Sequence, residues 1–385
     1  MLEKALRGSR VYWAWVLFLL AFAGAAFGLY LYGWIADVEL SNLSRDVVWG
    51  FFIANYTFMV GVAASAVMVV LPYYLHNQKE FGRITALGEF LAVGAVLTTL
   101  LFVMADVGQP TRAFNMYIYP TPGSPFFWNT NILPGYMVLN LIIAWFTLDA
   151  EQRGSKPARW VKWLILLSIP WAISIHTFTS FVYSGIVARP FWNTAILTPR
   201  FIASAFASGP ALLVLLALAV KKYAGYDPGS KAIEKVGLIV TYAMIINVFL
   251  VVAELWSALY SNIPAHLDHF RYLYLGLGGH AVLVPWMWVS AVLGIVSVVM
   301  LIAPQVRHSQ RLLAVACGIV VLSTWIDKGM GLVVGGFVPS PLDKITEYMP
   351  SAAEWFIAGG VYAAALLVVT VLYKIAIGVK QEVAG

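Results

Sequence analysis

Charged residues are scarce in this chain. Only 11% of its 385 residues are Asp, Glu, Lys or Arg, whereas a soluble domain contains about 25%. Hydrophobic residues make up 61% of the sequence. This composition excludes a soluble globular domain and predicts an all-α polytopic membrane protein, in which each spanning helix needs roughly 20 mostly apolar residues.

Cysteine is nearly absent as well. The single residue, Cys317, excludes an internal disulfide and any iron–sulfur or zinc site built on four thiolates. The net charge of +6 is carried by short segments between apolar runs, so it indicates membrane orientation and not nucleic-acid binding. These connecting segments leave no room for a soluble domain, so a large extramembrane partner would be a separate chain.

Apolar runs bounded by Pro, Gly and charged residues predict ten membrane-spanning helices. The first run follows three basic residues, and its length favours a retained helix over a signal peptide. Most of the 24 Lys and Arg residues lie at the two termini and in the even-numbered loops, which predicts that both termini are cytoplasmic. Arg200 is counted here with an odd-numbered, outer loop. The predicted spans are 11–33, 47–75, 84–106, 131–148, 160–187, 198–220, 235–261, 272–302, 310–337 and 354–377.

One short motif occurs twice on the predicted outer side. "FWNTNILPGY" occupies 127–136 and "FWNTAILTPR" occupies 191–200, each before a long apolar run. Trp128 and Trp192 suit the membrane–water interface. The residues expected to cap the following helices are Asn129 or Thr130 in the first copy and Asn193 or Thr194 in the second. The repeat indicates either two ordinary interfacial helix starts or two related, parallel units that frame a common outer-facing cavity.

Polar and ionisable residues within the predicted spans gather toward the outer side. A charge inside the bilayer is costly, so such residues are candidates for function. Glu89 alone lies clearly toward the inner side. The asymmetry predicts a polar site near the outer surface and argues against a continuous ion path. The residues on the outer side are Asn55, Tyr56, Asp106, His176, Glu254, His280, Asp327, Lys328 and Glu354.

His176 is the strongest candidate for proton chemistry. It lies in "WAISIHTFTSFVYSG", where Thr177, Ser180 and Tyr183 add hydrogen-bonding groups. Ser180 is four residues on and shares the helix face of His176. An imidazole is suited to exchanging a proton with a quinone oxygen. Two alternatives are a histidine that hydrogen-bonds between helices and a haem ligand paired with His280, the other histidine in a predicted span.

Two motifs contain neighbouring charges. In "ADVGQPTR", Asp106 and Arg112 can form an ion pair across the turn. That pair would either only fix the loop or also line a cavity mouth and anchor a partner. In "WIDKGMG", Asp327 and Lys328 are adjacent and cannot face each other on a helix, so each needs another partner. Glu254 is the candidate partner for Lys328.

Four stretches resemble the NrfD/polysulfide-reductase membrane-subunit family. The ten-helix form most resembles the quinone-reactive subunit of the Dsr membrane complex of sulfur-metabolising prokaryotes, with relatives in Hmc-, Qrc- and alternative-complex-III-type assemblies. The stretches are "WGFFIANYTFMVGVAASA", "ADVGQPTR", "SIHTFTSF" and "WIDKGMGLVVGGFVPSPLDKITEYMPSAAEW".

The resemblance implies two four-helix bundles, helices 2–5 (47–187) and helices 6–9 (198–337), flanked by helices 1 and 10. It also implies a subunit of the cytoplasmic membrane with no haem, iron–sulfur cluster or metal site of its own. Menaquinone or another quinone would bind non-covalently near the outer face, under a docked iron–sulfur subunit. Multihaem cytochrome c and haem b membrane subunits are further expected partners.

These observations lead to one hypothesis, a quinone-binding subunit of a respiratory electron-transfer complex in sulfur or sulfite metabolism. His176 would exchange a proton with the quinone, and Asn55, Tyr56, Ser180 and Tyr183 would orient it. The alternatives are a secondary transporter for a small anion or sulfur compound and a haem b subunit. The expected entrance and docking residues are Asp106, Arg112, Trp128 and Asn129, and the candidate proton route comprises Glu89, Glu254, Asp327, Lys328 and Glu354.

Overall fold

Ten apolar helices dominate the computed structural model, which describes residues 1–63, 65–74, 76 and 78–384. Within these residues the secondary structure is helical apart from one isolated bridge between Leu277 and His280. Each of the ten helices is long and apolar enough to cross a membrane. The prediction of an all-α, ten-span membrane protein is therefore confirmed.

The spans are α2 (Arg10–Ile35), α3 with α4 (Phe51–Ala63 and Val67–Tyr74), α5 (Thr85–Asp106), α7 (Pro125–Gln152), α8 (Arg159–Ser184), α9 (Leu197–Ala224), α10 (Ser230–Ser261), α12 (Val284–Ile302), α14 continued by η3 and α15 (Gln310–Thr324, Trp325–Gly331 and Leu332–Gly335), and α16 (Ala352–Ala384). The short helices are α1 (Glu3–Leu6), η1 (Lys79–Arg83), η2 (Pro110–Arg112), α6 (Asn115–Ile118), α11 (Pro264–Tyr274) and α13 (Pro304–His308). The expected end of the second span, residue 75, lies outside the described residues.

Several predicted boundaries are off by a few residues, and the last span, expected to end at 377, runs as α16 to Ala384. Two helix starts are wrong for a clear physical reason. The fourth span was expected from 131, but α7 begins at Pro125, because Ser124 caps the helix and proline is tolerated at its first position. The eighth span was expected from 272, but α12 begins at Val284. Gly276, Gly278 and Gly279 precede it with positive φ angles, a conformation that interrupts a helix.

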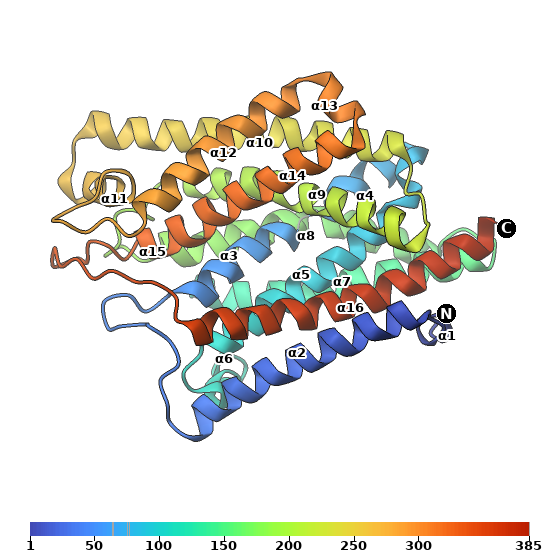
Figure 1. Ribbon diagram of the computed structural model, residues 1–385, viewed down its shortest axis with the longest axis horizontal. Coiled ribbons are helices and arrows are strands. Elements are labelled where there is room, and N and C mark those ends of the chain that lie inside the picture. The colour runs from blue at the N-terminus through green and yellow to red at the C-terminus, as the bar shows by residue number, and fades with distance from the viewer. Residues whose placement is uncertain (64, 75, 77, 385) are drawn as a thin grey trace.

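The spans lie side by side along the long axis of the molecule (Figure 1). Both chain termini lie at one end, which we call the terminal end. The long connections, together with α6 and α11, lie at the other, which we call the distal end. An ion pair between Lys4 and Glu382 at 2.7 Å joins the two terminal segments.

Packing divides most of the spans into two rings of four. The α3–α4 span, α5, α7 and α8 each pack against two others of their group, and α9, α10, α12 and α14 do the same. These are the two groups expected from the resemblance. The α3 helix also packs against α9, so one apolar core runs through both rings. Every residue of α3 is buried, whereas only three residues of α2 are buried, and α2 packs chiefly against α16.

The distal end is closed by α11 and by the segment 336–351. The His269 imidazole on α11 lies 2.9 Å from the carbonyl oxygens of both Gly335 and Val338, and burial lowers its pKa. In the same region the Glu347 carboxylate accepts hydrogen bonds from the Val282 amide and His280. Although burial alone would raise the pKa of Glu347, these bonds lower it. We call α11 and the segment 336–351 the distal cap. Several polar contacts attach it to the spans.

Candidate functional site

Three consecutive polar residues lie buried in the central part of α3. Successive side chains on a helix point about 100° apart, so Asn55, Tyr56 and Thr57 reach three different neighbours. The Asn55 amide oxygen accepts hydrogen bonds from Trp325 Nε1 at 2.9 Å and from the Tyr362 hydroxyl at 2.7 Å. Its amide nitrogen donates to the Phe51 carbonyl at 2.8 Å. Asn55 therefore connects α3 with η3 and α16, and all its side-chain polar atoms have partners.

Tyr56 belongs to a second chain of bonds that joins α3, α7 and α8. The Asn129 amide nitrogen donates to the Tyr56 hydroxyl, and the Thr179 hydroxyl donates to the Asn129 oxygen at 2.8 Å. All three side chains are buried. Asn129 therefore does not cap a helix, as the sequence suggested, because α7 already begins at Pro125. Trp128, beside it, remains 43% exposed and donates to the Pro122 carbonyl.

Thr57 and Tyr183 form a third contact between α3 and α8. Their hydroxyl oxygens are 2.5 Å apart. Thr57 also lies 2.7 Å from the Ile53 carbonyl, to which it donates, so Tyr183 donates to Thr57. The Tyr183 ring packs against Trp49, Trp192 and Phe201. Ser180, one turn earlier, lies 2.6 Å from the Thr198 hydroxyl of α9. We call the bonds of Tyr56, Asn129, Thr179, Thr57 and Tyr183 the neutral network.

His176 lies on the same helix as Thr179 and Tyr183. It is fully buried, yet neither of its ring nitrogens makes a hydrogen bond with any described residue. Buried polar atoms are normally paired, so an exception of this kind needs an explanation. A bond from His176 to another helix, one of the alternatives raised by the sequence, is not formed with any residue that the structure describes. The imidazole retains its capacity both to donate and to accept a hydrogen bond.

The expected pair of intramembrane histidines is wrong. His280 lies between α11 and α12, outside the ten spans, and its Nδ1 is 3.1 Å from the Glu347 carboxylate. The physical reason is the glycine-rich turn before α12, which places His280 in the distal cap. His176 and His280 therefore do not face each other as a ligand pair within the spans.

The second ring contains a buried charge cluster. Arg200 of α9 lies between two carboxylates, with its Nη1 2.5 Å from Glu254 of α10 and its Nη2 2.7 Å from Asp327 of η3. All three side chains are buried. A planar guanidinium can bind two carboxylates at once, which an ammonium group does less well. The sequence-based pairing of Glu254 with Lys328 is therefore wrong, as is the assignment of Arg200 to a loop.

Lys328 follows Asp327 in η3, a π-helix that continues α14. Its Nζ lies 3.3 Å from the Phe201 carbonyl and 4.5 Å from the centre of the Phe201 ring, and the side chain is buried. No described carboxylate forms an ion pair with it. Short π-helical segments often occur at functional sites. Here the segment directs Asp327 to Arg200 and Lys328 to the boundary between the two rings.

Asp106 and Arg112 do not form the expected ion pair. Asp106 ends α5, and its Oδ1 atom is shielded from solvent without a hydrogen bond to any described residue. Arg112 lies at the end of η2 and is exposed. An exposed guanidinium keeps its hydration and gains little from an ion pair. The loop is therefore not fixed by this pair.

The two remaining candidates for a proton route have different surroundings. Glu89, in the terminal half of α5, is buried, and its carboxylate makes no hydrogen bond with a described residue. Glu354 forms a capping box with Ser351 at the start of α16. It also accepts a hydrogen bond from the Tyr348 hydroxyl, which in turn accepts one from the Phe51 amide at 2.8 Å. Glu354 thus joins the distal ends of α16 and α3.

The structure therefore separates the predicted site residues into two groups. Tyr56, Tyr183, Asn129 and His176 lie in the first ring, whereas Glu254, Asp327 and Lys328 lie at Arg200. Sequence reasoning missed Thr57, Thr179, Arg200 and Tyr362. Thr57 and Thr179 are polar residues beside residues already selected, whereas Arg200 and Tyr362 have no selected residue next to them. Among the described residues, no three His, Cys, Asp or Glu side chains come close enough to hold a metal ion.

The architecture defines a multi-pass integral membrane protein whose polar groups are buried between its helices. Its sequence identifies the family. The family model for polysulphide reductase, NrfD, matches residues 39–338, and the chain belongs to this family.

Three curated relatives match most of their own length. A selenate reductase subunit of Mesobacillus selenatarsenatis is 23% identical over 384 residues, covering 88% of each chain. The Hdr-like menaquinol oxidoreductase integral membrane subunit of Archaeoglobus fulgidus is 23% identical, covering 97% of this chain and 95% of the relative. The menaquinone reductase integral membrane subunit of Nitratidesulfovibrio vulgaris is also 23% identical, covering 94% and 90%.

Proposed function

We propose that this chain is the quinone-interacting membrane subunit of a multisubunit electron-transfer complex. The names of two relatives that match almost end to end refer to menaquinol or menaquinone. The observation that carries the proposal for this chain is the buried His176 imidazole, which lacks a hydrogen-bond partner among the described residues. Menaquinone is the proposed substrate. Its reduced and oxidised forms would exchange between the site and the surrounding lipid.

The first ring supplies groups suited to an uncharged quinone ring. His176 would donate a proton as an imidazolium to a quinone oxygen on reduction, or accept one as a neutral imidazole on quinol oxidation. Tyr56 and Tyr183 carry hydroxyl groups that can orient the ring. Asn55 and Ser180 are already paired with neighbouring side chains and would act by fixing the surrounding helices.

Electrons would come from or pass to a separate chain, since two relatives are named as integral membrane subunits of oxidoreductases. We propose an iron–sulfur subunit docked at the distal end, beside Trp128 and Arg112, which are both exposed. Cytochrome c and haem b subunits of a complex in sulfur or sulfite metabolism are the further proposed partners. The distal end would then face the outside of the cytoplasmic membrane, with both termini inside.

Proton transfer through the protein is a finer part of the proposal. Glu254 and Asp327 are paired with Arg200, and Glu354 is engaged at a helix start. Glu89 and Lys328 have no ion-pair partner among the described residues, so they are the candidates whose protonation could change at least cost to the fold.

His176→Ala tests the proposal in the assembled complex. Because neither ring nitrogen bonds to a described residue, the substitution breaks no hydrogen bond there, and the complex is expected to assemble. Loss of a proton-transferring group should lower quinol-dependent electron transfer by about 100-fold or more. Ser174→Ala, on the same helix, removes only a local bond to the Trp171 carbonyl and serves as the control. Unchanged electron transfer in an intact His176→Ala complex would refute this role.

A further inference from the structure

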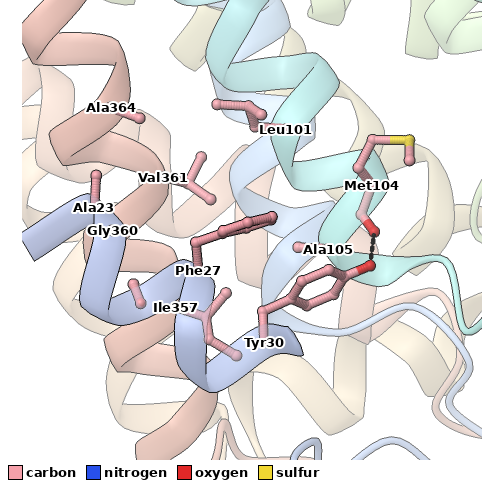
Figure 2. A pocket seen from close by; sticks show the side chains of 11 residues that line it. Ala23, Phe27, Tyr30, Leu101, Met104, Ala105, Ile357, Gly360, Val361 and Ala364 are labelled. Atoms are coloured by element: carbon pink, nitrogen blue, oxygen red, sulfur yellow. Dashed lines mark hydrogen bonds between the residues drawn. The ribbon is translucent and has the colours of Figure 1, made fainter. Parts of the chain in front are cut away.

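A groove opens between the first, third and last spans, α2, α5 and α16 (Figure 2). Phe27 of α2 lies near Leu101 on α5 and Val361 on α16, and Tyr30 lies beside Met104 and Ala105. The groove has a volume of about 130 Å³. A cavity of about 150 Å³ lined by apolar side chains binds benzene, so the groove has room for a short hydrocarbon segment.

The walls of the groove are mostly apolar. Its lining carries no charged side chain, and α2 leaves most of its own surface uncovered by protein. Phe27 is 60% exposed, which in a spanning helix means exposed to lipid. Gly360 and the alanines at 23 and 364 have short side chains and so leave space in the groove. A hydrocarbon chain from the bilayer is the occupant that this chemistry accepts.

The distal mouth of the groove is polar and acidic. The Tyr30 hydroxyl donates to the Met104 carbonyl at 2.9 Å (Figure 2). Asp106 follows two residues later, with its Oδ1 atom shielded and without a hydrogen bond to a described residue. Glu354 precedes the lining residue Ile357 by less than one helical turn. Carboxylates disfavour a phosphate group, but they accept hydrogen bonds from an uncharged hydroxyl-bearing ring.

The groove also adjoins the central polar residues. Val361 lines it, and the next residue, Tyr362, hydrogen-bonds to Asn55 of α3. Phe102 of α5 packs edge-on against the Tyr362 ring at 5.3 Å between centres. One layer of side chains therefore separates the groove from the central polar residues of α3.

We propose that this groove holds the isoprenoid chain of a quinone whose ring lies at the distal mouth, beside Asp106. The inference rests on the proposed function and adds the path by which the quinone reaches the protein. The quinone enters sideways from the bilayer between the first and last spans. Asp106 is then the first hydrogen-bond acceptor that the ring of a quinol meets.

Photolabelling of the purified complex tests the inference. The probe is an isoprenoid quinone with a diazirine in its chain, and the labelled peptides are mapped by mass spectrometry. Label is expected on 23–30 and 357–364, and excess unlabelled isoprenoid quinone should remove it. Ala23→Leu combined with Ala364→Leu should reduce the label about tenfold, equivalent to about two methylene groups losing their burial. Ala25→Leu adds the same side chain to the exposed face of α2 and should leave the label unchanged.

Three results would overturn the inference. The first is a groove that stays unlabelled while the α3, α7 and α8 peptides are labelled, which would leave the proposed function standing. The second is label in the groove that excess phosphatidylglycerol removes and excess isoprenoid quinone does not. The third is equal labelling of the Ala23→Leu, Ala364→Leu double variant and the Ala25→Leu control. The proposed function is checked separately by oxidation of a quinol without an isoprenoid chain, which does not use the groove.

Discussion

The two rings of helices bury polar groups in contrasting ways. In the first ring, Tyr56, Asn129 and Thr179 are joined by uncharged hydrogen bonds. In the second, Arg200 lies between the carboxylates of Glu254 and Asp327. Both sets are shielded from solvent.

The contrast indicates different tasks. A buried ion pair is strongly destabilising to break, because the remaining charge has no water to solvate it. Neutral hydrogen bonds are weaker and can be exchanged for bonds to a ligand at moderate cost. The charged cluster is thus suited to holding α9, α10 and η3 together, whereas the neutral network and His176 are suited to receiving an uncharged substrate.

The largest effect is expected from Arg200→Leu. It leaves Glu254 and Asp327 buried without their cation and should cost about 3–5 kcal/mol of stability. Thermal unfolding of the purified protein in detergent measures the loss. Adding Glu254→Gln and Asp327→Asn removes the unpaired charges and should recover part of it. A variant as stable as the wild type would show that the cluster does not hold the second ring together.

A smaller effect is expected from the tryptophans of the repeated motif, one within α7 and one in the segment before α9. Trp192 is fully buried and donates to the Leu332 carbonyl at 2.8 Å, whereas Trp128 is 43% exposed. Trp192→Phe should therefore destabilise the protein by about 1–3 kcal/mol through a lost bond and an unfilled volume. Trp128→Phe is the matched control and should change stability by at most about 0.5 kcal/mol. Equal effects in the same unfolding assay would remove this difference between the two copies.

The smallest effect is expected within the neutral network. Tyr56→Phe removes the acceptor for the Asn129 amide and should cost about 1 kcal/mol. A double-mutant cycle with Asn129→Leu measures the coupling of the two residues. If the coupling equalled the loss expected for Arg200→Leu, the two rings would not differ in how strongly their polar groups hold the helices together.

Much of the fold could be predicted from hydrophobic runs alone. A span is apolar along its whole length, so its composition alone reveals it, and the sequence predicts all ten. The boundaries of the spans are harder to predict. Whether "FWNT" lies inside a helix depends on Ser124 and Pro125, a few residues upstream, and not on the motif itself.

The candidate site was only partly predictable, because a single sequence does not show which residues on different helices contact each other. Asn55, Tyr56 and His176 could be selected as polar residues in apolar runs, but their bonds could not. The sequence places Arg200 in a loop because it lies near a span end, although in the structure it pairs with two carboxylates more than fifty residues away. The sequence places His280 in a span because its neighbours are apolar, although positive-φ glycines lead the chain out of the helix.

The pairing of α2 with α16 has a consequence for biogenesis. A chain enters the membrane from its N-terminus as it is synthesised, and N-terminal parts generally fold first. Yet α2 packs chiefly against α16, which begins more than 300 residues later in the chain. The α2 helix must therefore remain loosely held in lipid until α16 has been synthesised, and a polypeptide truncated before α16 would lack one wall of the groove in Figure 2.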